Sequence, residues 1–357
     1  MTSDLQAPMP YFGAKSTIAP LVWERLGDTP NYVEPFFGSG AMLLARPDAH
    51  QWWERIETVN DLDGFVSNFW RAIQSAPDDV AHWADWPVNE NDLHARHAWL
   101  LGRRETLQAR LEGDPAYYDA KVAGWWVWGM CAWIGSGWCS GNGPWHVVDG
   151  ELRKTSTDGN GAWRQRPHLG NAGQGINRQR PQLNNGGEGI NRRMAHLATG
   201  DGLAASWSGH LRAMMQRLSD RLRRVRVCCG DWSRICGPTP TVGHGLTAVF
   251  LDPPYAQEGR DSELYRVEMA VATAVRDWAV ERGDNPLYRI ALCGYEGEHD
   301  MPPSWECVAW KAKGGYSNQG DEDSPGHANA HRERVWFSPH CLRGDRTKQL
   351  RLMEEAT

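Results

Sequence analysis

The sequence predicts an α/β protein with a doubly wound, Rossmann-like sheet, into which a mostly helical and loop-rich segment is inserted. Apolar runs of strand length alternate with helical patterns, which is typical of a parallel sheet covered by helices. Several of these runs end directly at a glycine or an acidic residue, as strands do beside a ligand site. We therefore expect a discontinuous core of residues 1–75 and 225–340, an insert of residues 76–224 and a tail of residues 341–357.

Length and composition narrow the classes of protein to consider. A chain of 357 residues exceeds the usual size of a single core, so two lobes are expected. There is no basic-plus-apolar N-terminal signal and no apolar run approaching the roughly 18 residues that cross a membrane. The eight cysteines lack paired zinc spacing and predict reduced intracellular thiols. His327 and His331 have helical spacing without a third ligand, so no metal is expected.

The first half of the core is predicted around a glycine turn. A strand begins at Asn31 and opens into Gly38 and Gly40, and a short helix over residues 39–46 follows until Pro47 stops it. Glycines at such a turn let the backbone approach a ligand closely, as in nucleotide-binding loops. An ordinary turn is the alternative.

The second strand adds an acidic side chain to this turn. Residues 55–59 form the strand, which ends at Asn60 and Asp61, and Asp61 follows Gly40 by 21 residues. At this spacing a doubly wound sheet places an acid against a ribose diol. Leu43 stands where a dinucleotide fingerprint has its third glycine, which disfavours a pyrophosphate ligand such as NAD. An adenosine ligand without phosphates fits better, and S-adenosylmethionine is the obvious one.

Strands and helices resume after the insert. Residues 207–227 predict an amphipathic helix, with an inward face made of Leu211, Met214, Met215, Leu218 and Leu222. The later strands are expected over residues 226–229, 247–251, 288–293, 306–311 and 332–337, with a helix over residues 263–281. Gly38, Asp61, Asp231 and Asp252 all come at strand ends, so we expect them to share the edge of the sheet where ligands bind.

The tetrapeptide Asp252-Pro253-Pro254-Tyr255 follows the most apolar of these strands. Two prolines cannot continue a β-ladder, so the chain leaves the sheet at Asp252 with a stiff backbone. A carboxylate, a proline carbonyl and an aromatic ring then lie within a few ångströms of each other. The two oxygens can each accept one N–H of a planar amine while the ring stacks on its heterocycle. A solvated Pro-Pro turn is the alternative.

These motifs, taken in order, resemble those of the Dam-like DNA adenine-N6 methyltransferases of the α group. The resemblance covers roughly residues 8–75 and 225–340. It departs from the family at Tyr11, where Trp is common, and at Ala14, where a second glycine is usual. The matching segments are residues 11–15, 34–40, 60–63, 230–232, 252–255 and 334–339.

The resemblance implies S-adenosylmethionine as cofactor, double-stranded or single-stranded DNA as substrate, and a cytoplasmic enzyme of a bacterial cell or a phage-infected host. A homodimer is compatible with it but not required. The implied catalytic residues are Asp252, Pro253, Pro254 and Tyr255. The implied cofactor-binding residues are Tyr11, Lys15, Glu34, Phe36, Phe37, Gly38, Gly40, Asp61 and Asp231. Alternatively, Lys15 is a solvated lysine at a helix start and Asp231 is a turn residue.

The chemistry expected of this site is a direct displacement. The exocyclic amine of adenine is a poor nucleophile because its lone pair is conjugated into the ring. If Asp252 and the carbonyl of Pro253 accept its two hydrogens, the nitrogen can become tetrahedral and attack the methyl group in line. Tyr255 would stack on the target base, which a duplex hides and which must therefore be flipped out.

The insert carries the basic charge that DNA binding needs. The chain has a net charge of −6, yet residues 151–230 hold 14 Lys/Arg against 5 Asp/Glu. A 14-residue repeat spans residues 166–193 and is rich in Gly, Asn and Arg, which suit base edges and phosphates. We expect it to form loops over DNA, although a solvated basic face or a linker that orders on binding would also fit. The expected contacts are Arg166, Arg178, Arg180, Arg192 and Arg193.

Other interpretations stay open. An N4-cytosine methyltransferase presents a similar amine, although Asp rather than Ser at position 252 favours adenine. A methyltransferase of RNA or of protein amines, or an inactive DNA-binding homologue, would keep the same motifs. The tryptophan-rich segment 124–133 predicts a buried helix that packs in a core, with base stacking as the alternative.

Overall fold

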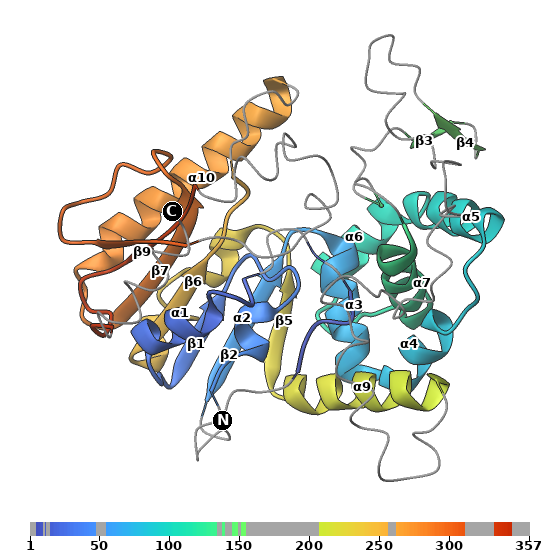
Figure 1. Ribbon diagram of the computed structural model, residues 1–357, viewed down its shortest axis with the longest axis horizontal. Coiled ribbons are helices and arrows are strands. Elements are labelled where there is room, and N and C mark those ends of the chain that lie inside the picture. The colour runs from blue at the N-terminus through green and yellow to red at the C-terminus, as the bar shows by residue number, and fades with distance from the viewer. Residues whose placement is uncertain are drawn as a thin grey trace, which may run out of the picture. The chain divides into compact units, whose positions relative to one another are not determined.

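The computed structural model describes residues 5–9, 11, 15–47, 55–133, 138–139, 145–148, 151–154, 207–255, 262–310 and 332–344. The chain divides into two compact units (Figure 1). Unit 1 consists of residues 1–6, 11–62 and 224–357, and unit 2 of residues 7–10 and 63–223. The segment 63–75, which the sequence analysis assigned to the core, therefore belongs to unit 2.

The described residues of unit 1 form a seven-stranded sheet in the order β5-β2-β1-β6-β7-β9-β8. All neighbouring strands are parallel except at β9, which runs antiparallel to both β7 and β8. The strands are β1 (Asn31–Glu34), β2 (Ile56–Asp61), β5 (Val225–Cys229), β6 (Thr247–Leu251), β7 (Tyr288–Tyr295), β8 (Glu306–Ala309) and β9 (Glu333–Phe337). The prediction of an α/β fold with a mostly parallel sheet is confirmed.

The sheet is doubly wound because its two halves extend in opposite directions from the centre. From β1 the chain proceeds outward through β2 to β5, and from β6 it proceeds outward to β7 on the other side. β1 and β6 are neighbours, so the order of strands reverses between them. In open α/β sheets, ligands bind at the carboxyl ends of strands at such a reversal.

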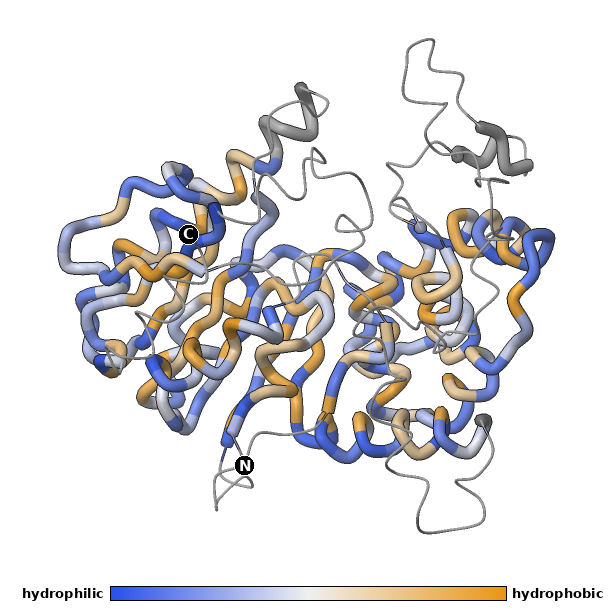
Figure 2. The backbone as a smooth tube through the Cα atoms, viewed as in Figure 1, coloured by the Kyte–Doolittle hydropathy of each residue, from blue (hydrophilic) through white to orange (hydrophobic). Residues whose placement is uncertain are grey.

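Burial explains why the central strands are apolar. Every residue of β6 is buried, as expected for a parallel strand covered on both faces. Val33, Val249 and Ile290 on neighbouring strands pack with Val275 of a helix into one core. Figure 2 shows hydrophobic residues, coloured orange, along these strands. The described helices of unit 1 are α1 (Ala19–Leu26), α2 (Ala41–Leu44), α10 (Ser262–Gly283) and the 3₁₀ turns η2 (Trp232–Ile235) and η3 (Val242–His244).

Element boundaries differ from the sequence prediction where local geometry intervenes. The helix predicted over residues 39–46 shortens to α2, because Gly40 takes a left-handed conformation (φ 66°) at its N-cap. The helix predicted over residues 207–227 ends at Leu222, and a two-residue turn leads into β5. β7 continues two residues beyond its predicted end, to Tyr295.

Unit 2 is mainly helical. Its buried helix α7 (Ala120–Ala132) packs against α3 (Gly64–Ser75) and α4 (Pro77–Ala84), and both Trp126 and Trp128 are buried there. The predicted inward face of α9 (Trp207–Leu222) is buried except for the half-buried Met214. The other elements among the described residues of unit 2 are α5 (Glu90–Leu101), α6 (Arg104–Gly113), β3 (Trp145–Val148) and β4 (Glu151–Lys154).

Some expectations fall outside the described residues, namely the repeat 166–193 with its five arginines, and His327 and His331. All eight cysteines are free thiols. Within the described ranges, no three His, Cys, Asp or Glu side chains group as metal ligands would. No helix in this part of the chain is both long and apolar enough to traverse a bilayer.

Candidate active site

The residues predicted to bind ligands lie at one edge of the sheet in unit 1. Gly38 follows β1, Asp61 ends β2 and Asp252 follows β6, and these three strands are direct neighbours. Asp231 follows β5, which pairs with β2. All four strands are parallel, so all four residues come at their carboxyl ends.

The glycine turn is held against the second strand by hydrogen bonds. The backbone N–H of Gly38 donates to Oδ2 of Asp61 (2.8 Å), and that of Phe37 donates to the carbonyl of Asn60 (2.9 Å). Gly38 has a φ of 48°, which favours glycine. A Cβ at this position would also lie 2.7 Å from Cε1 of Tyr11. The turn thus brings Gly38, Asp61 and Tyr11 together.

Asn60 connects three loops at this edge through hydrogen bonds. Its side-chain nitrogen donates to the carbonyl of Pro35 (3.1 Å) and to that of Gly230 (2.9 Å), and the residue is buried. It therefore links the ends of β1, β2 and β5. The sequence analysis placed Asn60 in a motif but gave it no role, because its partners lie far away in the chain.

Asp252 is held through one of its two oxygens. Nζ of Lys15 lies 3.0 Å from Oδ1, and the hydroxyl of Tyr255 donates to the same Oδ1 (2.9 Å). The Asp252 side chain is 21% exposed, so it does not point into bulk solvent. Both of these polar contacts fall on Oδ1, and no hydrogen bond from a described residue is made to Oδ2. Pro253 is buried and Pro254 is exposed.

Lys15 is a buried cation and not the solvated lysine of the alternative interpretation. It is 4% exposed, and Nζ lies 5.1 Å from the ring centre of Tyr255 and 5.7 Å from that of Trp310. Burial alone would lower the pKa of Lys15, but the carboxylates of Asp252 and Glu333 more than offset this, and the pKa lies above its usual value. The ammonium group stays charged at neutral pH.

Glu333 is a second acid of this cluster. Its Oε2 lies 3.2 Å from the Tyr255 hydroxyl, which donates to it or to Asp252. Burial raises the pKa of Glu333 to about 7, against the opposing effect of Lys15 and with a further increase from Asp252. Burial and the Asp252 carboxylate also raise the pKa of Tyr255.

The sequence analysis missed Glu333, and the topology explains its position. Because β9 is antiparallel to β7, its first residue, Glu333, pairs with the last residue of β7, Tyr295. An acid therefore reaches the edge where the parallel strands end. The only signal in the sequence is that Glu333 alternates with the apolar Val335 and Phe337 on one face of a strand.

Tyr295 and Trp310 complete the surroundings of Tyr255 and Lys15. The Tyr295 ring meets that of Tyr255 edge-on, with 4.6 Å between ring centres. Trp310 follows β8 and donates its backbone N–H to the carbonyl of Glu333 (3.2 Å). Tyr255 is thus half-buried against these side chains, and its stacking on a base remains a prediction.

Glu34 is the last residue of β1, just before the glycine turn, and its side chain points into the protein. It is buried, and Oε2 accepts from the hydroxyl of Tyr32 (2.8 Å). Burial raises the pKa of Glu34 strongly, the Tyr32 hydrogen bond opposes this, and the carboxylates of Asp252 and Asp61 raise it further. Glu34 is therefore within electrostatic range of both acids, which links the glycine turn with the Asp252 cluster.

Two further predicted residues, Asp231 and Phe36, lie at the turn that follows β5. Asp231 is exposed, and its Oδ1 accepts from the backbone N–H of Ser233 (2.9 Å), so in this structure it caps η2. Its neighbour Trp232 stacks on Phe36 with 6.3 Å between ring centres. Phe36 and Trp232 are both half-buried and offer an aromatic surface at the same edge.

Comparisons of this chain with protein-family models and with curated proteins find no match.

Proposed function

We propose that the chain is an S-adenosylmethionine-dependent DNA adenine-N6 methyltransferase that acts on an adenine flipped out of the helix. The observation that carries this proposal is the way in which neighbouring side chains hold the Asp252 carboxylate. Lys15 and Tyr255 hold its carboxylate through Oδ1, beside the turn that joins Gly38 to Asp61. An acid fixed through one oxygen presents the other in a defined direction, as binding a planar amine requires.

The residues at the cofactor edge fit S-adenosylmethionine. Asp61 supplies a carboxylate for a ribose diol, and Phe36 with Trp232 supplies aromatic rings for an adenine. Oδ1 of Asn60 is buried at the same edge and has no hydrogen-bond partner within the described part of the chain, which suits a polar ligand nearby. When bound, S-adenosylmethionine would supply a methyl group activated by its sulfonium charge.

The sheet itself supports this function. The sheet is parallel except for β9, which lies between β7 and β8 and runs in the opposite direction to both. This order resembles that of the Rossmann-like methyltransferase sheet, in which the cofactor lies at the carboxyl ends of the central strands. The segment 334–339, which the resemblance matches to this family, contains most of β9.

The chain's own residues would activate the amine by binding it. Oδ2 of Asp252 and the carbonyl of Pro253 each accept one N–H, which withdraws the nitrogen lone pair from the ring and directs it at the methyl group. Asp252 also stabilises the positive charge that develops on the nitrogen. Lys15 holds Asp252 in place and does not touch the base.

Product analysis tests the proposal. The purified protein is incubated with isotope-labelled S-adenosylmethionine and, separately, with duplex DNA, single-stranded DNA and RNA, and the nucleosides are analysed by mass spectrometry. We expect labelled N6-methyladenine from DNA. Labelled N4-methylcytosine would instead identify the cytosine enzyme, and label confined to RNA would reassign the substrate. Label on no nucleic acid, at cofactor concentrations that saturate the protein, would contradict the proposal.

A further inference from the structure

Two carboxylates compete for one hydroxyl hydrogen in the candidate active site. The Tyr255 oxygen lies 2.9 Å from Oδ1 of Asp252 and 3.2 Å from Oε2 of Glu333. A phenol has a single hydrogen, so it cannot donate to both oxygens at once. When both acids are ionised, one contact of the hydroxyl is between two acceptors. When Glu333 is protonated, it donates to the Tyr255 oxygen, which then donates to Asp252, and both contacts are hydrogen bonds.

We propose that Glu333 takes up, through the hydroxyl of Tyr255, the proton that the target amine loses on methylation. This inference rests on the proposed function and deepens it, because it says where the reaction's proton goes. Glu333 contacts neither the base nor the cofactor in this scheme. It is a positioning residue that acts through Tyr255.

The proton transfer balances without any further reactant. As the nitrogen–carbon bond forms and the carbon–sulfur bond breaks, the amine nitrogen becomes positively charged and still carries both hydrogens. One N–H bond breaks, its electron pair stays on nitrogen, and Asp252 receives the proton. The proton lies on Oδ2, so the carboxyl group of Asp252 turns about its Cβ–Cγ bond to bring this oxygen to Tyr255. It then passes the proton to the Tyr255 oxygen while the phenol's own hydrogen moves to Oε2 of Glu333. Asp252 is again a carboxylate, Tyr255 is again a phenol, and Glu333 is a carboxylic acid that later releases its proton to water.

The surroundings of Glu333 suit this role. The described groups that face it are Lys15, Asp252, Tyr255, Cys293 and Glu298. Burial raises the pKa of Glu333, Lys15 lowers it, and Asp252 and Glu298 raise it, with a result of about 7. An acid with this pKa is ionised often enough to accept a proton near neutral pH and weak enough to hold it.

Glu333→Gln separates proton uptake from structural support. The glutamine keeps an oxygen that accepts from the Tyr255 hydroxyl, but it cannot take a proton. Single-turnover methyl transfer to DNA is measured between pH 5.5 and 9, so that product release does not mask the chemical step. In the parent protein we expect the rate to rise with pH through about 7, because Glu333 must be ionised to accept. In Glu333→Gln we expect a rate about 10- to 100-fold lower at pH 8, without this rise.

Tyr255→Phe breaks the same path at its centre. We expect it to remove the rise near pH 7 as well, and the double variant to be no slower than the slower single variant, because both substitutions interrupt one transfer. Glu296→Gln is the matched control, since it removes an exposed carboxylate that pairs with Arg334 on β9. It should keep the parental pH profile.

Each result decides between the two proposals. Parental rates and an unchanged pH profile in Glu333→Gln, or additive effects of the two single variants, would overturn proton uptake by Glu333 while leaving methyl transfer intact. Absence of methyl transfer from the parent protein would overturn the proposed function, and the role of Glu333 with it.

Discussion

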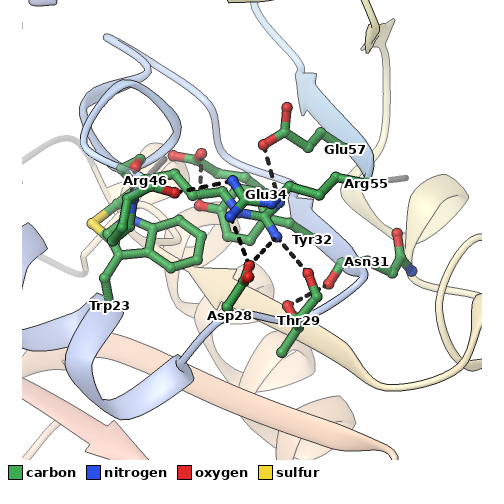
Figure 3. Close-up of polar contacts among 11 residues, drawn as sticks. Trp23, Asp28, Thr29, Asn31, Tyr32, Glu34, Arg46, Arg55 and Glu57 are labelled. Carbon is green, nitrogen blue, oxygen red and sulfur yellow. Dashed lines mark hydrogen bonds and ion pairs between the residues drawn. The ribbon is translucent and has the colours of Figure 1, made fainter. Parts of the chain in front are cut away.

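Unit 1 contains two buried charge networks, one at each edge of its sheet, and they are built differently. At the edge where β1 and β2 begin, the buried Arg46 lies near the rings of Trp23 and Tyr32 and pairs with Glu57 (3.0 Å) (Figure 3). It also donates to the carbonyl of Thr29. At the opposite edge, Lys15 pairs with Asp252 and lies near Glu333.

The difference lies in the balance of charge. Two arginines, Arg46 and Arg55, face two acids, Asp28 and Glu57, and arginine does not titrate near neutral pH. At the other edge Lys15 faces both Asp252 and Glu333, and burial raises the pKa of Glu333 to about 7, although Lys15 lowers it and Asp252 raises it further. A balanced network of permanent charges holds strands in place, whereas an unbalanced one at strand ends indicates a reaction site. The following substitutions test this distinction.

The largest effect is expected from Asp252→Ala. We expect single-turnover methyl transfer to fall by about 10³-fold, because the acceptor for the amine is lost. Binding of S-adenosylmethionine, measured by calorimetry, should persist. Asp28→Ala removes an acid of the other network and should leave the rate within about twofold of the parent. If Asp252→Ala retained turnover, the network around Lys15 could no longer be distinguished as a reaction site from the network around Arg46.

Arg46→Ala should affect stability and not chemistry. Removing one partner of a buried ion pair takes the Arg46 cation away from the buried Glu57, which costs about 3–5 kcal/mol of unfolding free energy. Urea denaturation measures this loss, and the rate per folded molecule should be unchanged. Arg55→Ala is the control, because its partner Asp28 is 59% exposed and such pairs contribute about 1 kcal/mol or less. Equal losses in the two variants would show that the Arg46 network does not anchor the strands.

Gly38→Ala tests whether the glycine turn binds the cofactor. A side chain there is strained at φ 48°, by about 1–2 kcal/mol, and would also push Tyr11 from a Cβ contact of 2.7 Å. We expect the affinity for S-adenosylmethionine to fall by about tenfold or more. Gly297→Ala carries the same kind of strain at φ 81° with nothing within 4 Å. If both variants bind the cofactor as the parent does, the turn is only structural.

The smallest effect concerns stability as a function of pH. The pKa of Glu333 is about 7 in the folded protein and 4.5 by itself, so the folded state binds the proton more tightly. The stabilisation is full below pH 4.5 and is lost as pH rises through about 7. Glu333→Gln lacks this loss, and we expect its unfolding free energy at pH 8 to exceed that of the parent by about 1–3 kcal/mol. A gain that is the same at pH 4 and pH 8 would contradict the assignment of this pKa to Glu333.

Much of the fold could be predicted because its signals are local. The apolar run of β6, the glycine turn after β1 and the acid that ends β2 are each contained in a few consecutive residues. Helix ends were predicted less well. The start of α2 depends on the left-handed conformation at Gly40, and residue type permits this conformation without requiring it.

The residues of the candidate site also separate into those that local sequence patterns predict and those that they do not. By itself, the sequence determined the order of strands and helices and the residues at strand ends, Gly38, Asp61 and Asp252, because hydrophobic periodicity and turn residues act over short distances. Only the tertiary structure decided that Lys15 and Glu333 join Tyr255 around Asp252. The reversed direction of β9 brings the start of that strand to the edge where the others end, and no local pattern specifies the direction of a strand.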